Sequence, residues 1–166
     1  MQAARENRAS GDLRIVGQTS EHVMVVEGDL VIHRLRGAVT QAYLDHSAVG
    51  LKAATEQSAD GKYVLVVLIE ATAKIPESGV RAESTRLWKK TESALRGHVI
   101  VLEGDGFWAA AVRSVLAGIM IVGRSAVPRE VVRKDDDAMK FLAKLEPSLP
   151  ARYVRAIGKV RAIQLG

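Results

Sequence analysis

The stretch KYVLVVLIE (62–70) is a nearly unbroken apolar run of the length of a β-strand. Such a run is typical of a strand that is buried on both faces, as in the middle of a parallel sheet. A second run of this kind, HVIVLE (98–103), follows after an amphipathic segment. Two buried strands joined by a helix predict an α/β fold with parallel strands at its centre.

Upstream of residue 62 the chain carries three short runs rich in Val and Ile, which are RIVGQTS (14–20), HVMVVEG (22–28) and DLVIHRLRG (29–37). We expect three strands here, and Glu27-Gly28-Asp29 predicts a turn that joins the last two as a hairpin. The spacing of apolar residues changes to three and four at Thr40. This change predicts a helix to about Ser58, with Thr40 as its N-cap.

Downstream of the first buried strand, apolar spacing predicts a second helix over 77–96, with Gly97 as its stop. A third helix is expected after Asp105, a strand over 129–133 and a fourth helix from Asp135 to about Leu145. The fold expected is therefore a mixed β-sheet of about five to six strands with four helices plus a C-terminal helix.

The length of 166 residues suits one domain with an ordinary core. We divide the chain into a flexible N-terminus (1–12), an α/β domain (13–148) and a basic amphipathic C-terminal helix (149–166). The chain has no cysteine, its N-terminus is polar, and no apolar run reaches the roughly 18 residues of a membrane span. We therefore expect a cytoplasmic protein.

The net charge of +5 is concentrated in the C-terminal helix, which carries four basic residues and no acidic one. The rest of the chain is close to neutral, and only 4% of residues are aromatic. Nucleic-acid binding usually needs a basic face across the domain, with aromatic residues where single strands stack. We expect no nucleic-acid partner.

The order of the predicted elements resembles the STAS domain of anti-sigma-factor antagonists. In that family an apolar strand and a short loop precede a D-S-S-G-L-like motif that opens the second helix. Here VLVVLIEATAKIPESGV (64–80) aligns without a gap and places IPESGV (75–80) over the motif. Pro76 and Glu77 stand where the family has its acidic residue and its first serine. The resemblance covers about residues 13–145.

What the resemblance implies is a non-catalytic interaction domain that binds a regulatory protein, such as an anti-sigma factor or kinase-like partner, in a partner-switching system. Ser78 falls on the serine that a partner kinase phosphorylates in the antagonists. A phosphate would add about −1.5 to −2 charges to a docking surface. The expected partner-docking residues are Glu77, Ser78, Gly79, Arg81 and Trp88. The alternatives are that Ser78 and Gly79 only start a helix, and that Trp88 is a core residue.

Catalytic signatures are missing from the sequence, which carries neither a Walker motif nor a GxSxG motif. Its four histidines show no HxH or HExxH spacing that would bring two onto one metal. We therefore expect no catalytic residues, no metal site and no cofactor, and we predict that the protein is not an enzyme.

A different function is suggested by the apolar segment FWAAAVRSVLAGIMIV (107–122), which is more apolar than a half-exposed helix requires. A SEC14-like domain that binds a small ligand or lipid in an apolar pocket between helices and sheet is the alternative. The same excess also suits a homodimer interface. The C-terminal helix is expected to pack on its own domain, and peripheral membrane contact through it is the less favoured alternative.

Overall fold

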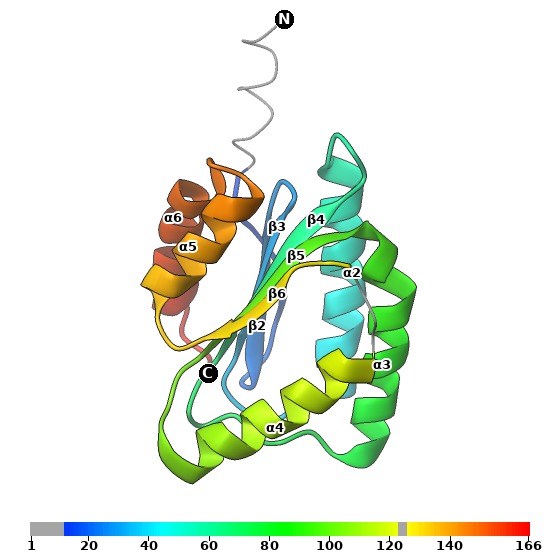
Figure 1. Cartoon of the computed structure of the whole chain (residues 1–166), viewed down its shortest axis with the longest axis vertical. Helices are drawn as coiled ribbons and strands as arrows, with labels where there is room; N and C mark the ends of the chain where they lie inside the picture. Colours follow the sequence, from blue (N-terminus) through cyan, green and yellow to red (C-terminus); the bar gives the residue numbers. More distant parts are fainter. Residues whose placement is uncertain (1–11, 123–125) are drawn as a thin grey trace, which may run out of the picture.

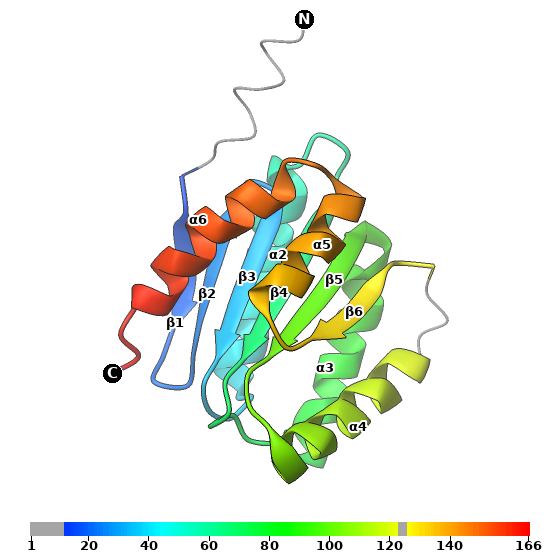
Figure 2. The ribbon, with the colours of Figure 1, turned by 60° about the vertical axis from the view of Figure 1, so that its left-hand side comes forward.

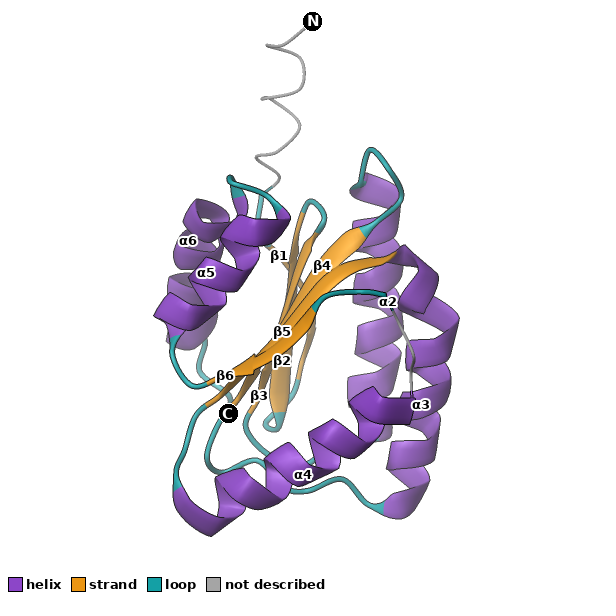
Figure 3. Ribbon diagram, in the orientation of Figure 1, coloured by secondary structure: helices purple, strands orange, loops and turns teal. Residues whose placement is uncertain are grey.

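A six-stranded β-sheet forms the centre of the molecule (Figure 3). The computed structural model describes residues 12–122 and 126–166. In both chain order and spatial order, the strands are β1 (Arg14–Gln18), β2 (His22–Glu27), β3 (Leu30–Leu35), β4 (Tyr63–Ile69), β5 (Leu95–Leu102) and β6 (Arg129–Val132). Strands β1 to β3 are antiparallel, and β3 to β6 are parallel.

Five α-helices accompany this sheet in the described residues, which confirms the predicted α/β class with a mixed sheet. They are α2 (Gln41–Gln57), α3 (Ser78–Thr91), α4 (Gly106–Val122), α5 (Asp135–Leu145) and α6 (Leu149–Ala162). Thr40 caps α2 as predicted, because its hydroxyl accepts a hydrogen bond from the Tyr43 amide. The turn at Gly28 has a φ of 61°, which glycine adopts without strain.

The helices form two layers, one on each face of the sheet (Figures 1 and 2). Helices α2, α3 and α4 each connect one parallel strand to the next strand in the same direction. Because such crossovers are right-handed, the three helices lie on the same face. Helices α5 and α6 cover the opposite face, so both faces of β4 and β5 are buried, as their apolar sequences predict.

The side chains of each strand alternate between two hydrophobic cores. One core joins Val66, Val101 and their neighbours to α5 and α6, and we call this side the α5/α6 face. The other joins Leu65, Ile100 and their neighbours to α2, α3 and α4, and we call this side the cavity face. The alternation assigns each apolar residue of a central strand to one core or the other.

Helix α6 packs on the sheet through the apolar side predicted from the sequence. Its buried residues are Leu149, Arg152, Tyr153, Ala156, Ile157 and Val160. The buried Arg152 donates from Nη1 to Asp29 Oδ1 at 2.8 Å and from Nη2 to the Glu27 carbonyl at 2.5 Å. These bonds fix α6 to the turn between β2 and β3.

The end of α3 and the N-terminal segment are the two places where the structure does not match a predicted boundary or does not test it. The helix predicted over 77–96 is too long, because α3 ends at Thr91 and a 3-10 turn (Glu92–Ala94) leads into β5. Leu95 pairs with Tyr63 and is buried in the sheet, and Gly97 lies inside the strand, where a Cβ would collide with Leu145. The predicted flexible N-terminus (1–12) lies outside the described residues, apart from Asp12.

Within residues 12–122 and 126–166, every helix is too short or too polar to cross a lipid bilayer.

Candidate ligand-binding site

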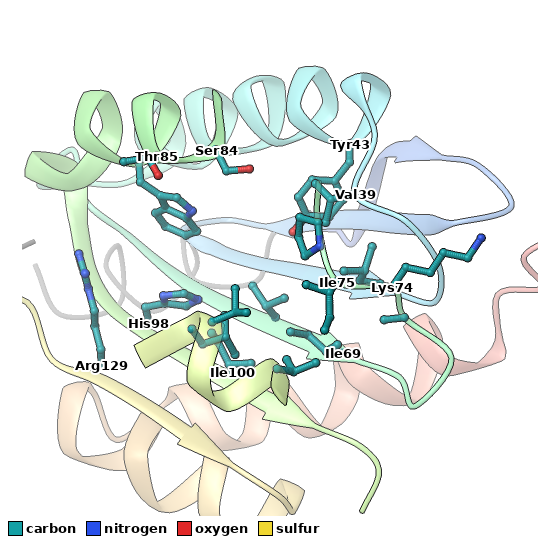
Figure 4. A pocket seen from close by; sticks show the side chains of 18 of the residues that line it. Val39, Tyr43, Ile69, Lys74, Ile75, Ser84, Thr85, His98, Ile100 and Arg129 are labelled. Atoms are coloured by element: carbon teal, nitrogen blue, oxygen red, sulfur yellow. The ribbon is translucent and has the colours of Figure 1, made fainter. Parts of the chain in front are cut away.

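A cavity of about 160 Å³ lies on the cavity face, between the sheet and helices α2, α3 and α4 (Figure 4). Most of its wall is apolar. Val39 follows β3, Ile69 ends β4, Ile100 lies in β5, and Val112 and Leu116 belong to α4. The cavity therefore brings together side chains from two central strands, from α4 and from the segment after β3.

Helix α3 leaves this space open because of the residues that it turns toward the sheet. Ser84, Thr85 and Trp88 line the cavity, because Ser84 and Thr85 each lie about one turn before Trp88 on the same side of the helix. The first two are short, and no residue of α3 is buried. Trp88 is the large side chain of this group, and it reaches across to the sheet.

At one end of the cavity the Trp88 indole stacks on the His98 imidazole, with ring centroids 4.9 Å apart and planes 25° from parallel. His98 lies in β5, is only 6% exposed and lines the cavity. Its Nε2 atom has no hydrogen-bond partner in residues 12–122 and 126–166. Burial, with a smaller effect of the Arg129 charge, lowers the pKa of His98 to about 3. The ring is therefore neutral at neutral pH.

Arg129 stands beside His98, because β5 and β6 place the two residues opposite each other in register. Its Nη2 atom donates to Glu92 Oε1 at 2.5 Å. Its Nε atom is buried and has no hydrogen-bond partner in the part of the chain that the structure describes. Arg129 and Glu92 also line the cavity, so this end presents two nitrogen atoms that the protein itself leaves unpaired.

The opposite end of the cavity is lined by Tyr43, Lys74 and Ile75 (Figure 4). The Tyr43 hydroxyl lies 3.1 Å from His33 Nδ1, and burial raises the pKa of Tyr43. Ile75 is 45% exposed, although it also contributes to the wall. The segment before α3 therefore lies between the cavity and solvent.

The histidines are closer together than their spacing in the sequence suggested. His22 of β2 and His46 of α2 lie 2.9 Å apart between Nε2 and Nδ1. Across residues 12–122 and 126–166, however, no group of three or more metal-ligating side chains is placed to hold a metal ion.

The residues that the sequence singled out for docking fall in two places. Glu77, Ser78, Gly79 and Arg81 are exposed at the start of α3. Glu77 is the N-cap, and its side chain makes no capping hydrogen bond. Trp88 faces the sheet and lines the cavity. The cavity itself was not located from the sequence, where the only signal was the apolar excess of 107–122.

Neither a scan of protein-family models nor a search of curated proteins finds a match to this chain. The resemblance of residues 64–80 to the STAS motif thus stays a prediction.

Proposed function

We propose that this domain binds a small apolar ligand in the cavity between its sheet and helices α2, α3 and α4. The observation that carries the proposal is the mostly apolar wall around a volume of about 160 Å³. An apolar cavity of about 150 Å³ is known to hold benzene. The volume therefore suits a ligand of similar bulk.

The cost of leaving such a cavity empty supports a binding role. Protein interiors are close-packed, and an unfilled apolar cavity costs about 24 cal/mol for each Å³. Larger residues at Ser84 and Thr85 would fill the space, whereas a ligand recovers the lost contacts when it binds.

Binding is tested with two phenylalanine substitutions on opposite sides of α3. Ser84→Phe fills the cavity, and Arg86→Phe adds the same ring to an exposed position of the same helix. We expect toluene to bind the wild type and Arg86→Phe saturably, with a rise in melting temperature and a change in tryptophan fluorescence. Ser84→Phe should lose both responses. Absence of saturable binding to the wild type would remove the proposal.

Docking to a regulatory protein is the second candidate function. It is favoured by the exposure of Glu77, Ser78, Gly79 and Arg81 at the start of α3, where a kinase and a partner can reach them. One helix then serves both roles, since its other side lines the cavity. We also propose a cytoplasmic location, because a chain without cysteine needs no oxidising compartment to fold.

The docking candidate is tested at Ser78. Wild type, Ser78→Ala and Ser78→Asp are used as baits in extracts of the source organism. A partner that is retained by wild type and Ser78→Ala but lost with Ser78→Asp would support a switch, and intact-mass measurement should then find a phosphate on the native protein. Identical partners for all three baits would exclude Ser78 as the control point.

A further inference from the structure

The polar groups at the His98 and Arg129 end of the cavity restrict the chemistry of the ligand, whereas the cavity volume restricts only its size. Both side chains extend from neighbouring strands at the same end (Figure 4). His98 Nε2 and Arg129 Nε are each buried without a hydrogen-bond partner among the described residues. Leaving a buried polar group unpaired costs about 1–3 kcal/mol, and more for a charged one. A ligand that supplies an acceptor to both atoms removes two such costs at once.

We infer that the ligand is a small apolar carboxylic acid whose carboxylate accepts hydrogen bonds from Arg129 Nε and His98 Nε2. This inference rests on the proposed binding function and specifies its ligand. A carboxylate offers two oxygen atoms and about four lone-pair sites, so it can accept from both groups at once. Hydrogen bonds between a guanidinium and a carboxylate are about twice as strong as neutral ones.

The charges around the cavity favour an anion. Lys74, Lys89 and Arg129 contribute to its lining, against the single carboxylate of Glu92 among the described lining residues. Arg129 Nη2 already donates to Glu92, so Arg129 Nε is the nitrogen that can donate to the ligand. Because His98 is neutral, Arg129 supplies the charge, and the imidazole supplies a hydrogen bond in its Nε2-protonated form.

The apolar part of the acid lies against Trp88 and the wall from β4, β5 and α4. A cavity close to that of a benzene site limits the acid to about six to eight carbon atoms in all, with its apolar part a chain or a ring. Hexanoate and phenylacetate are suitable probes. Their matched alcohols, 1-hexanol and 2-phenylethanol, keep the apolar part and remove the charge.

The test is a calorimetric titration of the full chain with each acid and its alcohol. In the wild type we expect the acid to bind about tenfold more tightly than the alcohol, which corresponds to about 1.4 kcal/mol. Arg129→Gln should bring the two affinities together while it leaves alcohol binding nearly unchanged. Arg133→Gln, at an exposed arginine close by after β6, is the control and should preserve the wild-type ratio.

The outcomes separate this inference from the function on which it rests. Alcohol binding equal to acid binding in the wild type, a measurement that needs no variant, would overturn the carboxylate inference and leave the binding function in place. An acid preference that survives Arg129→Gln would also overturn it. Binding of neither compound, together with no toluene binding, would remove the binding function itself.

Discussion

On the α5/α6 face, the buried Arg152 is hydrogen-bonded to Asp29 and to the Glu27 carbonyl, and the apolar residues of α6 fill the core. On the cavity face, α3 contributes no buried residue, and a cavity of about 160 Å³ separates it from the sheet. The same strands support both faces. The α5/α6 face is therefore the more completely packed of the two, and the looser cavity face is the one to which we assign the proposed ligand.

The largest effect is expected where the α5/α6 face is broken at Arg152. Arg152→Ala leaves the Glu27 carboxylate, itself 3% exposed, without the guanidinium that lies 3.6 Å away. Breaking a buried ion pair in this way costs about 3–5 kcal/mol. Urea denaturation measures the loss. Arg155→Ala is the comparison, because Arg155 donates to the same carboxylate but is 53% exposed, and it should cost less than Arg152→Ala.

Acid should destabilise the folded domain through the buried histidines of the cavity face. Burial lowers the pKa of both His33 and His98 to about 3, so the folded protein keeps them neutral, whereas the unfolded chain protonates them near pH 6.5. The free energy of unfolding therefore falls as the pH drops from about 6.5 to 5, by up to about 1.4 kcal/mol per pH unit for each imidazole. Urea denaturation across this range gives the slope. His98→Phe should reduce it, and an unchanged slope would contradict a neutral, buried His98.

An alanine-to-leucine substitution at one position on each face tests how tightly the two faces are packed. Ala138 of α5 is fully buried in the α5/α6 core, and Ala73 lines the cavity. Ala138→Leu should lower the free energy of unfolding by about 1–3 kcal/mol, because the core has no room for the added carbons. The cavity beside Ala73 can accept the added carbons of Ala73→Leu, so we expect the free energy of unfolding to fall by less than about 0.5 kcal/mol or to rise. Equal losses in chemical denaturation would argue against a usable cavity.

The smallest effect concerns the start of α3. Glu77 occupies the N-cap position without a capping hydrogen bond from its side chain. Glu77→Asp introduces a shorter side chain of a preferred capping type and should stabilise the protein by about 0.5–1 kcal/mol. Thermal denaturation measures the gain. Glu83→Asp, within the same helix, offers no such capping position and should give no gain.

The sequence predicted the fold better than the site. Uninterrupted apolar runs such as 62–70 identify buried strands, and Thr40 identifies a helix start, because both signals lie in neighbouring residues. The predicted helix over 77–96 extended too far, since the pairing of Leu95 with Tyr63 depends on a strand far away in the chain.

The candidate site depends almost entirely on such distant contacts. Trp88 meets His98 only after β5 is placed in the sheet, and His98 meets Arg129 only through the register of β5 and β6. The spacing of apolar residues along the chain does not reveal where the folded protein leaves a cavity. The apolar excess of 107–122 predicted a pocket as one alternative, but neither its position nor its polar end could be located.

The contact between Arg152 and the Glu27 carbonyl joins residues 125 positions apart. Strands β3 to β6 each pair with the strand that precedes them, so the sheet can grow in the order in which a ribosome delivers it. The α5/α6 face stays uncovered until α5 and α6 have been synthesised, and until that point its apolar surface is available to chaperones or to aggregation. Pulse-labelled hydrogen exchange during refolding should protect β3 and β4 before α6, whereas simultaneous protection would contradict this order of events.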